Sequence, residues 1–283
     1  MSPTRRSFSP GWSRFRRRGL RALHGPRLRV TRSYRTIRLG SAYGGWEFVP
    51  LLSLTKATVV SAGLGEDASF DVELAARFGC RVIVVDPTPR AIAHFRNLEA
   101  RVGEPSLEPY SANGRQSVRT YNLTSILPGQ MQLERRAVAG TSGAVRFYAP
   151  RDPSDVSYSI VNFQNNYASD TEWIEVQAVS IADLLEGVGI AAPELLKLDI
   201  EGAEIEALPA MLFQGIRPRQ ILVEYDELNW PSRRSRRNFD QVHGALTSCG
   251  YVVTAFDRRS CVSYLRLLGA SNDSTALGLE SDL

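Results

Sequence analysis

The sequence is poor in cysteine and histidine, and this shortage argues against disulfide-bonded and metal-binding proteins. Its 283 residues include three cysteines, Cys80, Cys249 and Cys261, with no Cys-x-x-Cys pair among them. An odd number of widely spaced cysteines fits neither a disulfide framework nor a zinc site, so we expect reduced thiols in a cytoplasmic protein. No set of His, Asp and Glu residues has the spacing of metal ligands, and we predict no metal.

Long apolar runs are also missing. No stretch approaches the roughly 18 uncharged apolar residues that a membrane-spanning helix needs, and the start lacks the continuous apolar core of a secretory signal. We therefore predict a soluble protein without a membrane span.

Acidic residues are absent from residues 1–38, which contain 12 arginines. Removing these 12 charges from the net charge of +4 leaves −8 on the other 245 residues, so the basic character belongs to the N-terminal segment alone. We expect residues 1–38 to form a basic, disordered tail, residues 39–268 one folded domain, and residues 269–283 a flexible C-terminus.

The tail leaves several functions open. Its arginines alternate with aromatic residues and could meet phosphates or an anionic membrane surface, and an Arg-rich, acid-poor leader also resembles an organelle transit peptide. Arginine outnumbers lysine 32 to 2 over the whole chain, which indicates a compositional bias and weakens any functional interpretation of arginine.

The strongest motif is the segment "TVVSAGLGEDASFDVELAARFGCRVIVVDPTP", residues 58–89. An apolar strand breaks at Gly63 and Gly65, a helix follows, and a second apolar strand ends on Asp86. The glycines let the backbone turn tightly and approach a ligand, and Asp86, 23 residues after Gly63, places a carboxylate where it can accept hydrogen bonds from a ribose. This pattern is typical of an α/β domain that binds a nucleotide-type cofactor.

The rest of the chain continues the α/β pattern. We expect strands near 132–139, 144–148, 173–179, 194–200 and 220–225, helices from Pro89 and over 203–213 and 238–249, and two short strands, 251–256 and 261–267, that form a hairpin. The prediction is a doubly wound, mostly parallel, seven-stranded sheet with a C-terminal antiparallel hairpin. His94 falls off the apolar face of its helix and is expected to be exposed, and residues 103–130 form either a functional loop or unrecognised elements.

A second group of carboxylates follows two later strands. The segment "LLKLDIEGAEIEALPAML" brings Asp199 and Glu201 to the end of one strand, and "ILVEYDE" brings Glu224 to the end of the next. Ligands of open α/β sheets bind outside the carboxyl ends of the strands, so these acids should lie near the reactive end of the cofactor. Alternatively, Asp199 and Glu201 cap the following helix or bind loop amides, and Glu224 is a paired charge.

The glycine motif alone does not identify the cofactor, because Gly63-x-Gly65-x-x-Ala68 also satisfies the dinucleotide pattern of a nicotinamide-dependent oxidoreductase. The architecture favours S-adenosylmethionine. Parallel α/β units that finish in an antiparallel hairpin suit the methyltransferase variant of the sheet, whereas a dehydrogenase more often shows a second mononucleotide half.

The segments 63–89, 195–208 and 221–227, in this order and spacing, resemble the FkbM family of S-adenosylmethionine-dependent methyltransferases over roughly residues 43–267. The resemblance implies a class I methyltransferase sheet and O-methylation of a hydroxyl on a sugar, glycoconjugate or natural product, so the partner would be a small-molecule or glycan acceptor. It places Asp199 and Glu201 near the transferred methyl. The residues expected to hold the cofactor are Ser61, Gly63, Gly65, Glu66, Asp67, Asp86 and Pro87.

One position departs from the general methyltransferase pattern. Ser61 occupies the place where many of these enzymes have an acidic residue that binds the methionine part of the cofactor. The alternatives for that role are Glu66, Asp67 and the segment from Tyr43 to Glu47.

A hydroxyl acceptor must lose its proton as the new bond forms, so a general base is required. The candidates are Asp199, Glu201, Glu224 and His243. We favour a carboxylate, Asp199 first, because His243 suits an ordinary half-buried helix residue.

The arginine run Arg233–Arg237 is expected in a loop, where it could attract an anionic acceptor or form a solvated surface run. A nucleic-acid-binding or nucleic-acid-modifying protein would explain the arginines, but the charge of −8 on the body argues against it.

Overall fold

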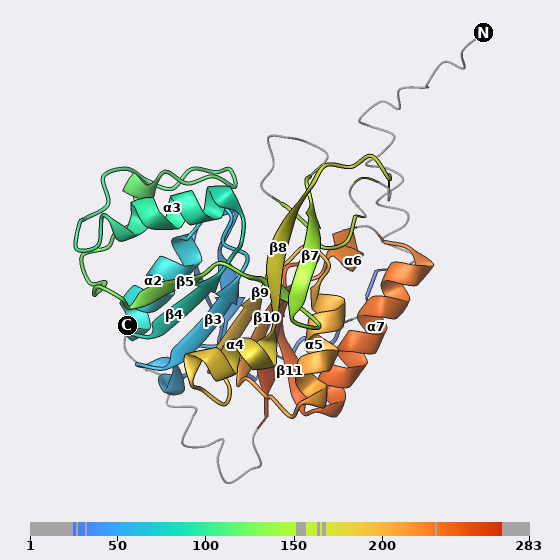
Figure 1. The fold of residues 1–283 in the computed structure, drawn as a ribbon. Coiled ribbons are helices and arrows are strands. Elements are labelled where there is room, and N and C mark those ends of the chain that lie inside the picture. Colours follow the sequence, from blue (N-terminus) through green and yellow to red (C-terminus); the bar gives the residue numbers. More distant parts are fainter. Residues whose placement is uncertain are drawn as a thin grey trace.

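A seven-stranded sheet organises the described part of this computed structural model, residues 25–26, 28–31, 33–150, 157–162, 165, 168–229 and 231–267 (Figure 1). Across the sheet the strands run in the order β11 (Tyr251–Phe256), β12 (Cys261–Arg266), β10 (Gln220–Glu224), β9 (Leu195–Leu198), β3 (Thr58–Ala62), β4 (Arg81–Val85) and β5 (Met131–Glu134). The α/β class and the seven strands are as predicted.

Strand direction divides the sheet into two parts. The five strands from β10 to β5 are parallel to one another, and β12 pairs antiparallel with both β10 and β11. The carboxyl ends of β3, β4, β9 and β10 therefore lie along one edge, which is where ligands bind in open α/β sheets.

Helices cover both faces because the central strands are apolar on both sides. On one face, Val59 and Val82 pack with Phe70 of α2 (Ser69–Phe78) and Phe95 of α3 (Pro89–Glu99). On the other face, the core includes residues of three helices, α4 (Ile181–Val188), α5 (Glu204–Phe213) and α7 (Arg233–Ser248). Each fully buried aliphatic or aromatic side chain of this kind contributes about 1.5–3 kcal/mol to folding.

Local capping explains where the helices after β3 and β4 begin and end. Gly79 ends α2 in the left-handed conformation with φ of 59°, and Thr88 accepts a hydrogen bond from the Ala91 amide at the start of α3, with Pro89 in the first turn. These boundaries are the ones that the sequence predicts.

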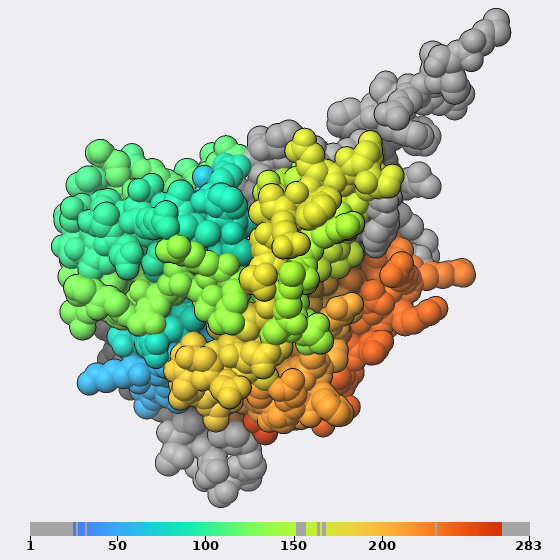
Figure 2. Space-filling model, in the orientation of Figure 1, coloured from blue at the N-terminus to red at the C-terminus, as the bar shows by residue number. Residues whose placement is uncertain are grey.

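Smaller elements surround the sheet. β1 (Ile37–Leu39) pairs with β2 (Trp46–Phe48), and β8 (Trp173–Ser180) pairs with both β6 (Ala137–Ala139) and β7 (Gly143–Tyr148). Figure 2 shows the β7–β8 pair as a ridge on the face of the molecule turned to the viewer. Short helices occupy Leu52–Leu54 (η1), Val118–Thr120 (η2) and Asp226–Asn229 (α6).

Part of the predicted tail packs against the sheet. Val30 forms a parallel bridge with Val253 of β11, the Thr31 amide donates to the Val253 carbonyl at 2.8 Å, and Leu28 contacts the core. These residues cover the outer edge of β11. Residues 1–24 of the tail and the whole C-terminal segment 269–283 lie outside the described residues.

Two local predictions are wrong. His94 is buried, with 8% of its surface exposed, and its Nε2 lies 2.8 Å from the Tyr121 hydroxyl because residues of the segment 103–130 fold over α3. The Arg233–Arg237 run is helical instead of a loop, since the Ser232 hydroxyl accepts a hydrogen bond from the Ser235 amide and starts α7 there.

None of the helices in the described ranges combines the length and hydrophobicity needed to cross a membrane.

Candidate functional site

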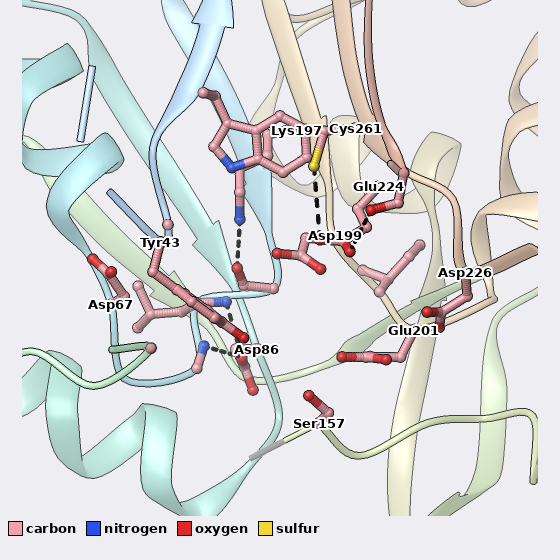
Figure 3. A pocket seen from close by; sticks show the side chains of 18 of the residues that line it. Tyr43, Asp67, Asp86, Ser157, Lys197, Asp199, Glu201, Glu224, Asp226 and Cys261 are labelled. Atoms are coloured by element: carbon pink, nitrogen blue, oxygen red, sulfur yellow. Dashed lines mark hydrogen bonds between the residues drawn. The ribbon is translucent and has the colours of Figure 1, made fainter. Parts of the chain in front are cut away.

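A cavity of about 770 Å3 opens at the carboxyl ends of β3, β4, β9 and β10. Its wall contains nine of the ten residues predicted for the site: Gly63, Gly65, Glu66, Asp67, Asp86, Pro87, Asp199, Glu201 and Glu224. Figure 3 shows this cavity from close by. Segments far apart in the sequence therefore meet where the parallel sheet places them.

Ser61 is the residue that the structure does not bring to the wall. It is 1% exposed and lies within β3, away from the cavity wall. A side chain in this position does not reach a ligand in the cavity.

The glycine turn is shaped by contact with the neighbouring strand. Gly63 has φ of 86°, and a Cβ atom there would lie 1.8 Å from the carbonyl oxygen of Asp199. The Gly63 amide donates to Val85, and the Asp199 amide donates to Ala62, both at 3.0 Å. Glycine is thus required at position 63 because the backbone of β9 approaches it, in addition to any contact with a ligand.

Asp86 braces this turn. Its Oδ2 accepts hydrogen bonds from the Leu64 and Gly65 amides, each at 3.0 Å, and its Oδ1 accepts from the Thr88 amide at 2.9 Å and the Thr88 hydroxyl at 2.7 Å. A carboxylate offers about four acceptor positions, and all four are used within the protein. Asp86 is 6% exposed and lies on the wall, so a ribose contact would have to share one of these oxygens.

Glu66 and Asp67 have different surroundings. Glu66 forms ion pairs with Arg90 and Arg115. Asp67 accepts from the Ser41 hydroxyl at 2.6 Å and from the Ser69 amide at 2.9 Å, which ties the β1–β2 connection to the start of α2. Asp67 therefore places the Tyr43–Glu47 segment against the glycine turn, and both line the cavity.

Four carboxylates gather at the other end of the cavity: Asp199, Glu201, Glu224 and Asp226 (Figure 3). Glu224 accepts from the Ser260 hydroxyl at 2.9 Å and from the Asn229 amide group at 3.1 Å. None of the described residues donates a hydrogen bond to the carboxylate of Asp199. The acceptor positions of the Asp199 carboxylate are therefore not used by the described residues, and Asp199 lines the cavity.

Burial dominates the electrostatics of this cluster. It raises the pKa of Asp199 well above its usual range, and repulsion from Glu224 adds to the rise while Lys197 opposes it. Burial, with repulsion from Asp226, likewise raises the pKa of Glu201. Burial and repulsion from Glu204 raise the pKa of Asp226 from 3.8 to about 8. In all three cases burial therefore favours the protonated form of the carboxyl group.

The turn that carries Glu201 is strained. Glu201 has φ of 54°, a left-handed conformation that costs a non-glycine residue on the order of 1–3 kcal/mol. The Ser159 hydroxyl donates to the Glu201 carbonyl at 2.5 Å, and the Gly202 amide donates to Glu204 at 2.9 Å. No side chain caps α5, so the alternative in which Asp199 or Glu201 caps this helix is not observed.

Sequence reasoning missed Asp226 and Lys197, which also line the cavity. The motifs contain both residues, Asp226 two positions after Glu224 and Lys197 two positions before Asp199, but no local pattern shows that their side chains reach the cavity. His243, the remaining candidate base, is half-buried in α7 with Nδ1 3.1 Å from the Tyr264 hydroxyl, and it is not part of the wall. Over the described ranges, no group of three or more His, Cys, Asp and Glu residues is placed to hold a metal ion.

A comparison with protein families matches most of the chain. A model of the methyltransferase FkbM domain matches residues 50–253. No curated protein matches the chain in sequence. Two solved structures of the antibiotic-resistance methyltransferase Kmr are similar to it at 11% and 13% identity; each comparison covers 82% of this chain and 100% of the Kmr chain, with a TM-score of 0.35.

Proposed function

Because the chain belongs to the FkbM methyltransferase family over residues 50–253, we propose that it transfers a methyl group from S-adenosylmethionine to a hydroxyl of a sugar, glycoconjugate or other natural product. The observation that carries this proposal is the shared cavity, in which the glycine turn after β3 and the carboxylates after β9 and β10 face the same space. The family match also supports S-adenosylmethionine over the nicotinamide cofactor that the glycine motif alone allows.

The residues present fit this cofactor. The cavity of about 770 Å3 lies within the usual range for small-molecule sites, and its wall offers carboxylates for a cofactor that carries a sulfonium, an ammonium and a ribose diol. We assign the ribose to the Asp86–Pro87 side and the methionine part to the turn of Gly63 and Gly65. Ser61 does not reach the wall, so Asp67 and the Tyr43–Glu47 segment are better placed to hold the ammonium than Ser61.

When bound, S-adenosylmethionine supplies an electrophilic methyl group on a positively charged sulfur. The chain's own residues then align the acceptor with that methyl, exclude water and remove a proton. We assign proton removal to Asp199, because its carboxylate accepts no hydrogen bond from the described residues and lies on the wall. The hydroxyl proton moves to Asp199, while Glu201 and Glu224 orient the acceptor by accepting hydrogen bonds from its other hydroxyls.

Two measurements test this function. Calorimetry should show binding of S-adenosylmethionine and not of NAD, and mass spectrometry should then show the gain of one methyl on a member of a panel of hydroxylated metabolites. Asp199→Asn should leave cofactor affinity within about threefold and lower turnover by roughly 100- to 10,000-fold, the usual contribution of a general base. Glu99→Gln, an exposed carboxylate on α3, is the matched control. Binding of NAD alone, or full turnover by Asp199→Asn, would contradict the assignment.

A further inference from the structure

A buried lysine lies beneath the glycine turn. Lys197 occupies β9, opposite Ser61 of β3 in the parallel register, and only 4% of its surface is exposed. A lysine is seldom buried to this extent unless its charge has partners. The chain has only two lysines beside 32 arginines, so a lysine at this position stands out from the compositional bias.

The ammonium group contacts the turn directly. Lys197 Nζ donates to the Gly63 carbonyl at 2.5 Å (Figure 3) and to the Ala62 carbonyl at 3.4 Å. It also lies 5.7 Å from the centroid of the Trp46 ring, within the range of a cation–π interaction. Lys197 thus holds the carbonyl side of the Gly63 peptide, while β4 holds its amide.

The same ammonium is a positive charge among buried acids. Lys197 lowers the pKa of Asp199, against the effect of burial and of the neighbouring carboxylates, and it lowers the pKa of Asp71 on α2 in the same way. The titratable groups that act on Asp199 from the surrounding elements are Asp86 after β4, Glu201 after β9, Glu224 at the end of β10 and Cys261 at the start of β12. All of them carry negative charge when ionised, so Lys197 opposes their combined repulsion.

We propose that Lys197 is a positioning residue for the transfer reaction: it fixes the glycine turn against which the cofactor lies and places a positive charge next to Asp199. This inference rests on the proposed function, because it concerns the same cavity. It also explains the residue type. A compact ammonium fits between two carbonyls and an indole ring, whereas the planar, forked guanidinium of arginine needs more space and a different set of acceptors.

Three variants separate the two roles. Lys197→Met keeps the length of the side chain and removes the charge, and Lys197→Arg keeps the charge and changes its shape. Lys56→Met is the matched control, because Lys56 is the other lysine of the chain and is exposed. For each variant we would measure S-adenosylmethionine affinity by calorimetry and the pH dependence of kcat/KM.

Lys197→Met should weaken cofactor affinity by about 10- to 100-fold, the effect of losing a hydrogen bond from a charged donor. It should also move the acidic limb of the kcat/KM profile to higher pH, since Asp199 loses its neighbouring cation and ionises later. Lys197→Arg should restore the position of the limb but not the affinity. An unchanged limb in Lys197→Met would show that the lysine only fills space, and would overturn the proposal.

A measurement on the wild-type protein covers the case in which Lys197→Met does not fold. Labelling with 15N-lysine gives only two side-chain ammonium signals, and the Lys197 signal should exchange its protons with water at least about tenfold more slowly than the Lys56 signal, because its protons are hydrogen-bonded and buried. Equal exchange at the two sites would refute the positioning role. Failure of the proposed function is distinguishable, because it would appear as wild-type protein that binds no S-adenosylmethionine.

Discussion

Replacing Asp86 should show whether the carboxylate acts by bracing the glycine turn. In Asp86→Ala the four donors on Leu64, Gly65 and Thr88 lose their acceptor. A buried donor without a partner costs about 1–3 kcal/mol, and water entering from the cavity would rehydrate the less buried of them. Loss of repulsion between Asp86 and Asp199 returns part of this cost. We therefore expect a decrease of roughly 3–5 kcal/mol in the free energy of unfolding.

Asp86→Asn should behave differently, because the amide keeps one oxygen. That oxygen can face the Leu64 and Gly65 amides, which only donate, while the new NH2 group faces Thr88, whose hydroxyl can turn and accept. Only the bond from the Thr88 amide is then lost. The expected decrease is about 1–2 kcal/mol.

Urea unfolding of the two variants and of the control Glu99→Ala, together with calorimetry of S-adenosylmethionine binding, tests this order. Asp86→Ala should bind the cofactor at least about tenfold more weakly than Asp86→Asn, because the loosened Leu64–Gly65 segment lines the cavity. A stability of Asp86→Ala within about 0.5 kcal/mol of wild type would refute the bracing argument. An equal loss of stability and of cofactor affinity in both variants would show that the negative charge of Asp86, and not its hydrogen-bonded oxygen, is required.

Two further predictions follow from the same site. Gly63→Ala should lower the free energy of unfolding by more than about 4 kcal/mol, because its Cβ would overlap the Asp199 carbonyl, whereas Gly79→Ala, at φ of 59° in open space, should cost only about 1–2 kcal/mol in denaturant unfolding. The pKa of Asp226 is raised from 3.8 to about 8, so the folded state favours its protonated form and loses stability as pH rises from about 4 through 8. Asp226→Asn should flatten this pH dependence by a few kcal/mol when unfolding is followed across that range, and parallel stability curves for the two proteins would contradict the assignment.

Elements with local signals were predictable from the sequence. The β3–α2–β4–α3 unit follows from apolar strands, a glycine that ends one helix, and Thr88 with Pro89 that start the next. The parallel sheet then brings Asp86, Asp199 and Glu224 to one edge, because the carboxyl ends of parallel strands lie together. These features depend on residues close in sequence or on a general rule of topology.

Features that depend on contacts between distant segments were not predictable. His94 was expected to be exposed, but Tyr121 lies against it. The sequence could not show this contact, because the loop that carries Tyr121 has no regular pattern. The hydrogen bond from Lys197 to Gly63 joins residues 134 positions apart and exists because β9 lies beside β3. Asp226 lines the cavity as the first residue of the short helix α6, which follows β10.

Helix α4 is not among the helices predicted from the sequence, because short helices are difficult to recognise from the pattern of apolar residues. Ser180 caps it and Ile181, Leu184 and Leu185 are buried, which is the correct pattern for a helix, but eight residues give too few turns to distinguish this pattern from a loop. The start of α7 is a related case. Four arginines in its first turns oppose the helix dipole, so the sequence favours a loop there, and packing of Phe239 and Val242 against the core outweighs that preference.

The pairing of residues 30 and 31 with β11 bears on how the protein can be shortened. Strand β11 is the outermost strand on its side of the sheet, and Val30 and Thr31 are bonded to its free edge at Val253. A truncated version starting at Ser33 would leave the backbone amides and carbonyls of that strand open to another molecule. Because bare strand edges promote association between copies, such a version should aggregate even with the cavity residues intact, and a version starting at Gly25 should stay monodisperse.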